Sequence, residues 1–457
     1  MPKKKTALTI EERLQQALVP AEEQPYEVPE NWVWVRLESV ASWGSGGTPS
    51  RKHEEYYNGD ILWIKTGELN NGWIYDTEEK ITDEGLKKSS AKLFPPYSVL
   101  IAMYGATIGK VAILGVPATT NQACACAVCN QSLLYMYLFY YCISQKNVFI
   151  EKGKGGAQPN ISQIILKQHP IPLPPLSEQQ RIVERIEELF AKLDEAKERL
   201  QEVADSFAVR KAAILHKAFT GELTKQWRLE NGVSDESWEE KLLGDVCTVN
   251  PKKIDAKNLD DNLEVSFVPM AAVSDVLGEI VNHEVKNLQD VRTGFTNFSK
   301  GDVIFAKITP CMENGKSAIV GPLVNDIGYG STEFYVLRCK EELNNKYLYH
   351  MVRNTTFRAE AKAVMTGAVG QQRVPKTFLQ EYQLLLPTLP EQHEIVRLID
   401  DLLARERAAQ QAAEQALASI DLMKKSILAR AFRGELGTNK ASEASALELL
   451  RQVLAEN

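Results

Sequence analysis

Two stretches of the chain carry apolar residues that alternate at spacings of four and three, the pattern of a long helix with one apolar stripe. The first stripe consists of Ile182, Ile186, Leu189, Leu193, Ala196, Leu200, Val203 and Phe207. The second is richer in alanine and consists of Ile395, Ile399, Leu402, Glu406, Ala409, Ala413, Ala416, Ile420 and Met423. Each stretch therefore predicts a helix of about 40 residues, roughly 60 Å long.

Two packing arrangements of these helices remain open: each packs on its own domain, or the two pair antiparallel as a coiled coil. The small residues of the second stripe favour pairing, with Leu193 and Leu200 filling space left by Ala416 and Ala409. Glu406 would then meet Arg210 or solvent. The expected inter-helix packing residues are Ile182, Ile186, Leu189, Leu193, Leu200, Phe207, Ile395, Ile399, Leu402, Ala409, Ala416 and Ile420.

The rest of the chain is different, with short β-branched and aromatic runs broken by Gly, Asn and Pro. These runs predict strand-rich domains of mixed α/β (α+β) class. The expected organisation is an N-terminal helical extension (1–29), a first domain (30–172), a first spacer helix (173–236), a second domain (237–385), a second spacer helix (386–436) and a helical tail (437–457).

The sequence also repeats itself. LPPLSEQQRIV from Leu173 returns as LPTLPEQHEIV from Leu386, and AILHKAFTGEL from Ala213 returns at the same offset as SILARAFRGEL from Ser426. Weaker copies precede each helix; Trp32 pairs with Trp238, for example. Such repetition indicates an internal pseudo-two-fold repeat, with the domains separated by the antiparallel helices. A pseudo-two-fold protein suits a target with two half-sites.

Composition and charge narrow the class of protein. The chain has 457 residues, a net charge of −7 and seven cysteines, an odd number. The acidic balance argues mildly against a stand-alone nucleic-acid binder, although it does not describe how charge is distributed. The cysteines suggest a reducing compartment, and neither a membrane-length apolar run nor a signal-peptide core is present. We expect a cytoplasmic protein without membrane contact.

Several segments resemble catalytic motifs but lack residues that those motifs require. FPPY, from Phe94, resembles a methyltransferase motif that requires a polar first residue, and GATIGK, from Gly105, is one residue short of a phosphate loop. Glu284, Lys286 and Asp275 form a triplet that is common by chance. Four cysteines lack the partners of a zinc site and are expected to be buried in strands: Cys124, Cys126, Cys129 and Cys142. We therefore expect no catalytic residue, no metal and no cofactor in this chain.

The order of these parts resembles the specificity subunit of type I restriction-modification enzymes. The resemblance is carried by PYEVPENWVWVRL (Pro25–Leu37), GGTPSRK (Gly46–Lys52), YGATIGK (Tyr104–Lys110), TNQACA (Thr120–Ala125), LPPLSEQQRIVERIEELF (Leu173–Phe190), KAFTGEL (Lys217–Leu223), LPTLPEQHEIV (Leu386–Val396) and ARAFRGEL (Ala429–Leu436).

This resemblance implies that each domain is a target-recognition domain reading one half of a split sequence in double-stranded DNA. The helices would be spacers that dock two methyltransferase subunits, which use S-adenosylmethionine to methylate adenine. Restriction subunits that use ATP and Mg would join them, and this chain would itself be non-catalytic. The alternatives are a stand-alone or orphan sequence-specific DNA-binding protein and a fused enzyme with its own active site.

Polar and basic loop residues are the candidates for DNA contact, since loops on a rigid scaffold commonly carry binding. Lys110 and Lys316 occupy equivalent positions in the two halves, which suggests a shared phosphate contact. The candidates are Ser45, Thr48, Arg51, Lys52, Tyr104, Thr107, Lys110, Gln158 and Asn160 in the first half, and Asn250, Lys252, Lys253, Lys307, Thr309, Asn314, Lys316, Gln371 and Arg373 in the second.

Helix ends are marked by capping boxes at Thr9 with Glu12 and at Ser177 with Gln180. A further short helix is expected at 443–456. The two terminal helices either fray in solvent or pack on the spacer or a partner, closing the repeat.

Overall fold

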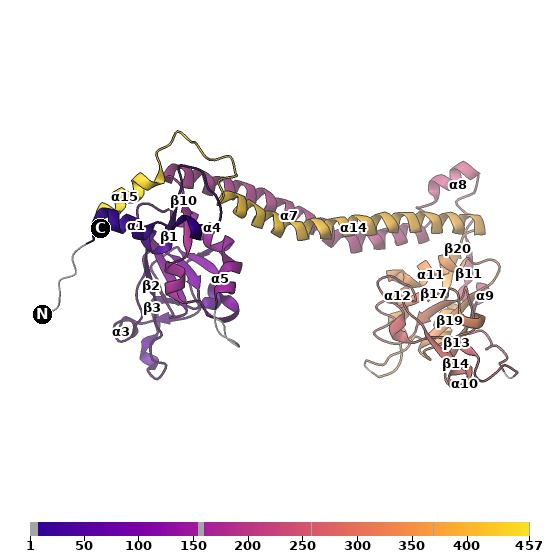
Figure 1. Cartoon of the computed structure of the whole chain (residues 1–457). Coiled ribbons are helices and arrows are strands. Elements are labelled where there is room, and N and C mark those ends of the chain that lie inside the picture. The colour runs from indigo at the N-terminus through magenta and orange to yellow at the C-terminus, as the bar shows by residue number, and fades with distance from the viewer. Residues whose placement is uncertain (1–7, 154–159, 257, 369, 457) are drawn as a thin grey trace. The chain divides into compact units, whose positions relative to one another are not determined.

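The structure is a computed structural model that describes residues 8–153, 160–256, 258–368 and 370–456. The chain is of mixed α/β class, with two globular domains and two long helices, α7 (Leu176–Phe219) and α14 (Leu389–Ala431) (Figure 1). Its contacts divide it into unit 1, which is Met1–Leu200 with Ala416–Asn457, and unit 2, which is Gln201–Gln415. Each unit therefore contains one domain and a segment of each long helix.

Unit 1 contains a five-stranded sheet of order β2-β9-β6-β7-β4, a three-stranded sheet β5-β3-β8 and the pair β1-β10. Its strands are β1 (Val33–Arg36), β2 (Ala41–Ser45), β3 (Tyr57–Ile64), β4 (Trp73–Ile74), β5 (Lys80–Ile81), β6 (Val99–Ala102), β7 (Val111–Leu114), β8 (Thr119–Thr120), β9 (Cys124–Cys129) and β10 (Pro170–Leu173). Its shorter helices are α1 (Ile10–Ala17), α2 (Leu37–Val40), α3 (Asp83–Lys87), α4 (Tyr135–Ser144), α5 (Lys146–Lys152), α6 (Gln163–Lys167) and α15 (Ala446–Glu456).

Unit 2 repeats this plan with a four-stranded sheet of order β12-β19-β16-β17, a second sheet β14-β13-β18-β15 and the pair β11-β20. Its strands are β11 (Glu239–Leu242), β12 (Cys247–Val249), β13 (Glu264–Val268), β14 (Glu284–Asn287), β15 (Thr296–Phe298), β16 (Val303–Ala306), β17 (Ser317–Ile319), β18 (Gly328–Gly330), β19 (Phe334–Cys339) and β20 (Gln383–Leu386). Its shorter helices are α8 (Lys225–Asn231), α9 (Leu243–Val246), α10 (Leu288–Val291), α11 (Asn345–Arg353), α12 (Thr355–Ala363) and α13 (Lys376–Glu381).

The central sheet of each unit is buried on both faces. In β9, Ala125 and Ala127 face the cluster that contains α4, whereas Cys124 and Cys126 face the cluster shared with the second sheet. The same alternation in β16 places its residues in two clusters. Because successive strand residues point to opposite faces, an unbroken small or apolar run such as CACA suits a sheet between two layers.

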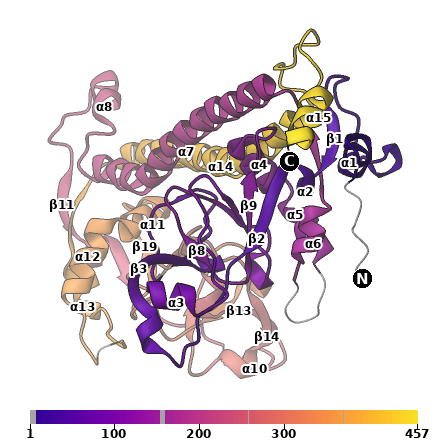
Figure 2. The same ribbon diagram turned by 90° about the vertical axis from the view of Figure 1, so that its left-hand side faces the viewer.

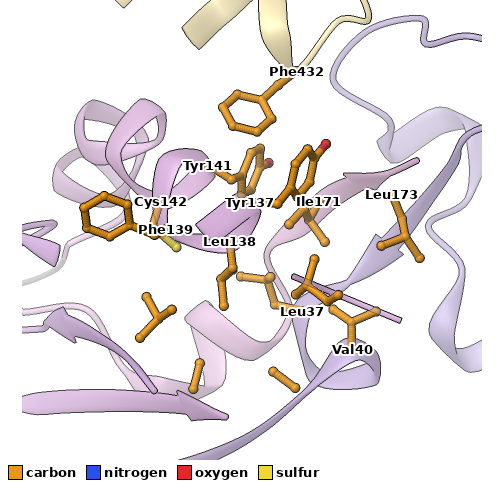
Figure 3. Packing of buried hydrophobic residues seen from close by; sticks show 14 of the residues in the cluster. Leu37, Val40, Tyr137, Leu138, Phe139, Tyr141, Cys142, Ile171, Leu173 and Phe432 are labelled. Atoms are coloured by element: carbon orange, nitrogen blue, oxygen red, sulfur yellow. The ribbon is translucent and has the colours of Figure 1, made fainter. Parts of the chain in front are cut away.

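The core of unit 1 joins the domain to the long helices. Figure 3 shows Phe432, which follows α14, above the rings of Tyr137 and Tyr141 from α4. The ring centroids of Phe432 lie 5.2 Å and 5.0 Å from those of Tyr137 and Tyr141, in edge-to-face contacts that aromatic rings favour. The Tyr137 hydroxyl donates to the carbonyl of Pro172 in β10. Domain and helices of this unit therefore share one core.

Two buried polar residues at the start of each long helix fix it to its domain. Gln179 donates to the carbonyl of Ser132 (2.9 Å) and accepts from the amide of Leu134 (2.9 Å), just before α4. Its copy Gln392 donates to Glu342 (2.9 Å) and accepts from Asn344 (2.8 Å), just before α11. The same side chain thus makes the same pair of bonds in both units.

The neighbouring carboxylates are also buried, but their partners differ. Glu178 accepts from the Trp32 indole (2.8 Å) and from Asn439 (2.8 Å). Burial raises its pKa. Glu391 instead forms an ion pair with Arg228, with 2.6 Å between Nη1 and Oε1. Burying a carboxylate is costly unless it is paired, and the two units provide different partners at this position. Among the described residues, the Oε2 atom of Glu391 has no hydrogen-bond partner.

The long helices run antiparallel beside each other within each unit. In unit 1, Asp194 pairs with Lys424 (2.5 Å), and in unit 2, Arg210 pairs with Glu406 (2.9 Å), the contact expected from the sequence. Ile182, Ile186, Phe207, Ile395, Ile399 and Ile420 are buried, and Leu189, Leu193, Leu200, Leu402 and Ala416 are partly buried.

The expected register of the pair is wrong. Because Asp194 lies against Lys424, Leu193 lies about two turns from the level of Ala416. Ala409 is exposed and does not belong to the seam, and Met423 is also exposed. Gln410, one residue after Ala409, is partly buried instead, and Ala413, Ala416 and Ile420 continue the stripe as expected.

The terminal helices α1 and α15 pack against each other in unit 1 (Figures 1 and 2). Arg13 donates to the carbonyl of Leu454 (3.2 Å), and Leu450 belongs to the core that contains Trp32. The capping box of Thr9 with Glu12 is confirmed. The one at Ser177 is wrong: α7 begins at Leu176, and the Gln180 side chain bonds to Glu184.

Four cysteines of unit 1 lie in β9 and α4. Cys124 and Cys126 are buried in β9 as expected, whereas Cys142 is buried in a helix, α4, and Cys129 is only partly buried. Burial raises the pKa of Cys126 to about 12. A thiol that stays protonated is a poor nucleophile and metal ligand.

Of the helices that the structure describes, none is both long enough and apolar enough to cross a bilayer.

Burial of His169 makes the stability of unit 1 depend on pH. The side chain is 3 % exposed, and burial with the nearby Lys152 ammonium lowers its pKa from 6.5 to about 3. Between these values the unfolded chain binds one more proton than the folded chain, so stability falls as pH falls through this window. Each pH unit costs about 1.4 kcal/mol where the proton difference is complete.

We therefore expect His169→Gln, which is neutral at every pH, to flatten the pH dependence of the free energy of unfolding between pH 6.5 and pH 4. Urea unfolding of parent and variant across this range measures the difference. His53→Gln is the control, because His53 is exposed. Parallel curves for His169→Gln and the parent would contradict the assignment.

Candidate nucleic-acid interface

The candidate residues of unit 1 come from segments that leave one end of the central sheet. β2 and β6 both run antiparallel to β9, with Ser45 opposite Ala125 and Ala102 opposite Cys124. The carboxyl ends of β2 and β6 therefore meet at the amino end of β9. We call this the variable end of the sheet; it carries the loop 46–56, the turn 103–110 and the segment 121–123 in unit 1.

The loop after β2 is held tightly against the domain. Gly46 and Gly47 have no room for a Cβ atom, because the Thr120 carbonyl and the Ser90 region lie within contact distance. The Trp63 indole donates to the carbonyl of Gly47 (2.9 Å). Thr48 donates from its hydroxyl to Gln122 (2.5 Å) and is exposed, as is Lys52. These polar groups are presented on a fixed backbone.

Arg51 is placed by both an ion pair and stacking. Its guanidinium lies 2.7 Å from Glu79 and 4.4 Å and 5.2 Å from the ring centroids of Tyr57 and Trp63. The side chain remains more than half exposed. DNA contact by Arg51 would compete with the Glu79 carboxylate, whose pKa is lowered by hydrogen bonds from Lys65 and Arg51.

The turn between β6 and β7 joins four further candidates. Tyr104 forms a β-bridge with Asn160, although the two are far apart in sequence, and Thr107 donates to the Tyr104 carbonyl (2.8 Å). Lys110 ends the same turn, directly before β7. Tyr104 is 47 % exposed. Gln158 lies outside the described residues.

Unit 2 brings its candidates to the same end of its sheet. Val249 pairs with Leu337 and Ala306 with Phe334, so the segments after β12 and β16 again meet at the amino end of β19. The segment 366–374 joins them through bridges of Arg373 to Ile308 and Thr366. Segments carrying the second-half candidates therefore converge on one place. Lys252, Lys253, Asn314 and Gln371 are exposed there.

Several unit 2 candidates are already bonded to the fold. Asn250, with a φ of 53°, exchanges two hydrogen bonds with Val336 and continues the strand pairing. Thr309 accepts from the Gln372 amide (3.1 Å), and the Lys307 ammonium lies 5.3 Å from the Tyr335 ring centroid. The side chains of Asn250, Thr309 and Lys307 therefore help to fix the conformation of the loops that carry them.

Arg373 is held more firmly still. Its Nε and Nη2 both donate to Glu333, and its Nη1 donates to the Gln371 carbonyl (3.1 Å). This bonding lowers the pKa of Glu333. Reading a base edge would require this ion pair to open. The sequence did not reveal Glu333 or Glu79, since each lies far along the chain from its arginine and in no motif.

Lys110 and Lys316 occupy equivalent places, because each backbone carbonyl accepts from the last residue of the preceding strand, Ala102 or Ala306. Their ammonium groups differ: that of Lys316 donates to the Met270 carbonyl (3.1 Å), whereas that of Lys110 forms no hydrogen bond or ion pair with the residues that the structure describes. Lys110 is therefore the freer of the two charges.

The kinds of side chain at the variable ends indicate what these surfaces can bind. Within the described ranges, no group of three or more His, Cys, Asp or Glu side chains is arranged to hold a metal ion. Each variable end presents hydroxyl, amide and cationic side chains on fixed loops, together with carboxylates such as Glu79 and Glu333 that pair with its arginines. Such groups suit phosphates and base edges.

A family model and individual relatives both relate this chain to type I restriction specificity subunits. The family model described as type I restriction modification DNA specificity domain matches residues 29–205 and again 235–416. The chain is 32 % identical to the specificity subunit of the type I restriction enzyme EcoEI from Escherichia coli, over 48 % of this chain and 44 % of that protein, less than half its length. It is 25 % identical to the StySPI specificity subunit from Salmonella potsdam, over 94 % of this chain and 96 % of that protein.

The fold also matches a solved structure. The HsdS subunit from Thermoanaerobacter tengcongensis superposes with a TM-score of 0.64 at 20 % identity, covering 90 % of this chain and 99 % of that one. At this identity the match shows the shared fold.

If Lys110 contacts a phosphate, Lys110→Glu should weaken DNA binding uniformly across sequences and reduce the dependence of log K on log salt by about one counterion. Lys316→Glu should do the same in unit 2 and additionally lose the bond to Met270. Titration of the protein with duplexes at several salt concentrations measures both quantities. Lys197→Glu on α7 carries the same charge change and is the control. Affinity equal to that control would remove the residue from the interface.

Proposed function

Starting from the fact that the chain belongs to the type I restriction modification DNA specificity family, we propose that it recognises a bipartite, asymmetric sequence in double-stranded DNA. Each unit would read one half-site through the variable end of its central sheet. The observation that carries this proposal is the duplication of that end: one topology, repeated, presents different side chains in the two units.

The difference between the two ends supports unequal half-sites. The β6–β7 turn of unit 1 carries Tyr104 and Thr107, whereas the β16–β17 turn of unit 2 carries Thr309 and Asn314. Hydroxyls and amides at different positions match different patterns of donors and acceptors in the major groove. An asymmetric target follows from a symmetric scaffold whose loops have diverged.

The long helices would set the spacing between half-sites. With 44 and 43 residues, α7 and α14 are each about 65 Å long and unbroken. Pairing in both units stiffens them. A rigid spacer of fixed length selects half-sites a fixed distance apart and leaves the intervening bases unread.

The same helices would dock two methyltransferase subunits. Val209 on α7 is 71 % exposed, and its copy Leu422 on α14 is 65 % exposed. Exposed aliphatic side chains at equivalent places in both copies suit two equivalent docking faces. These partners would bind S-adenosylmethionine and methylate adenine, and restriction subunits using ATP and Mg would complete the system. This chain would contribute recognition and no catalysis.

Methylome sequencing of the host tests the proposed recognition. We expect a bipartite motif with methylated adenine in each half-site, and loss of that methylation when the gene is deleted. Exchange of residues 30–172 for those of a relative should change one half-site only. Methylation that persists after deletion, or a single uninterrupted motif, would contradict the proposal and favour a stand-alone DNA-binding protein.

Charge introduced on one docking face should remove one partner. Burying an aliphatic side chain contributes about 1.5–3 kcal/mol, so Val209→Asp or Leu422→Asp should weaken one methyltransferase site at least tenfold. Native mass spectrometry should show the assembly falling from two methyltransferases to one, and to none in the double variant. Ala404→Asp, exposed on α14, is the control. Retention of two partners by the double variant would place the docking faces elsewhere.

A further inference from the structure

Unit 2 contains a pocket of about 830 Å³ between its helix segments and its domain. α7 contributes Ala208, Lys211 and Leu215, and α14 contributes Leu403 and Arg407. The domain side is formed by α11 and by residues 276–280. A volume of this size is ordinary for a site that receives a ligand or a short chain segment.

The pocket is cationic in a chain that is acidic as a whole. Five of its lining residues are Lys or Arg, namely Lys211, Lys346, Arg353, Arg358 and Arg407, against the carboxylates of Asp400 and Glu279. The chain has a net charge of −7. Asp400 is already shared by Lys346 (3.0 Å) and His350 (3.1 Å), which lower its pKa to about 2. The remaining cations exceed the anions available to them.

Arg353 and Arg358 are bonded to carbonyl groups rather than to a carboxylate. Arg353 donates to Gly315 (2.8 Å) and Asp275 (2.8 Å), and Arg358 donates to Glu313 and to the Arg353 carbonyl. Among the described residues neither forms an ion pair within 4 Å. Burial and the neighbouring Arg353 charge lower the pKa of Arg358. An anionic group placed here would relieve the repulsion between two guanidinium groups.

The corresponding place in unit 1 shows that the fold does not require these charges. Gln179 bonds to Leu134 just as Gln392 bonds to Asn344, so Leu134 and Asn344 occupy equivalent positions. The same offset along the chain aligns Ile143 with Arg353. The helix repeat likewise aligns Asp194 with Arg407. Unit 1 therefore has an apolar and an acidic residue where unit 2 has two arginines. Stability of the shared fold does not account for the excess of cations.

The apolar side chains of the lining restrict the chemical class of ligand that the pocket can bind. Leu215, Leu277, Ile280 and Leu403 line the same pocket, and Val276 at its edge is 83 % exposed. Phosphodiesters remain hydrated and would leave these side chains uncovered, whereas a peptide with acidic and aliphatic residues would match both kinds of group. Val209, on the proposed docking face, directly follows the pocket residue Ala208 on α7.

We propose that this pocket receives an acidic, partly aliphatic segment of the methyltransferase subunit that docks on unit 2. The proposal rests on the proposed function and adds a regulatory consequence. Arg353 and Arg358 also bond to the carbonyls of Gly315 and Glu313, in the turn that carries the DNA candidates Asn314 and Lys316. A segment that orders these arginines orders the reading turn, so partner binding and DNA binding strengthen each other.

Arg407→Glu is the first test, because Arg407 lines the pocket and is exposed. Within the described part of the chain, the one hydrogen bond of its side chain is to the Leu403 carbonyl of its own helix. Arg405→Glu is the matched control, two residues away on α14 and outside the pocket lining. The probe is the methyltransferase encoded beside this gene, titrated onto the full-length chain. Arg407→Glu should weaken one of the two methyltransferase sites at least tenfold, while Arg405→Glu stays within about twofold of the parent.

A photo-crosslinker at Val276 in the purified complex identifies the occupant. We expect crosslinks to an acidic segment of the methyltransferase, and a Glu→Lys change in that segment should restore binding to Arg407→Glu. Hydrogen exchange of residues 311–316 should slow when the methyltransferase binds the parent, and should not slow with Arg407→Glu.

Crosslinks to DNA, crosslinks elsewhere on the methyltransferase, or equal binding by Arg407→Glu and Arg405→Glu would each overturn the pocket proposal. If the complex still contains two methyltransferases and still methylates a bipartite motif, the proposed function stands without it. If no methyltransferase binds the parent chain, both proposals fall together.

Discussion

The structure depends on satisfying two buried polar side chains at the first turn of each long helix. Gln179 and Gln392 bond to the backbone just before α4 and α11, so helix and domain cannot shift against each other without leaving an amide unpaired. The adjacent buried carboxylates add to the free-energy cost of such a shift, since removing one partner of a buried charge typically costs about 3–5 kcal/mol. Glu391 bonds to Arg228 and Thr224 through Oε1, and Glu178 bonds to Trp32 and Asn439. The Glu-Gln pair is kept in both copies while its partners vary, which indicates that the junction itself is the constraint.

A fixed junction frees the opposite end of each sheet to diverge. The turns after β6 and β16 keep equivalent backbone bonds, such as Ala102 to Lys110 and Ala306 to Lys316, while their side chains differ. Loop changes there alter chemistry without disturbing the core, which is buried on both faces of the central sheet. This division explains how one scaffold, duplicated, can present two dissimilar surfaces.

The sequence was sufficient for the class of fold, the repeat and the long helices, because these follow from periodicity and from identity between copies. It failed where the outcome depends on long-range geometry. The register of α7 against α14 is set by Asp194 with Lys424 and by Arg210 with Glu406, and small-against-large reasoning misplaced Leu193 and Ala409. Ser177 looked like a helix cap, yet α7 starts one residue earlier. The candidate loops meet at one end of each sheet, but the ion pairs of Arg51 and Arg373 could not be foreseen, since Glu79 and Glu333 belong to no local pattern.

The ion pairs of Arg51 and Arg373 affect how selectively these two arginines would bind DNA in the proposed function. An arginine held by a carboxylate is already oriented, so little side-chain entropy is lost when it meets its target. It must nevertheless exchange a carboxylate for a base edge or phosphate, and only a partner offering two well-placed acceptors replaces a bidentate pair such as Arg373 with Glu333. A mismatched base offers one acceptor or none, and the ion pair then persists. If Arg51 and Arg373 contact DNA as proposed, restraint by Glu79 and Glu333 lowers affinity for every sequence but lowers it most for the wrong ones.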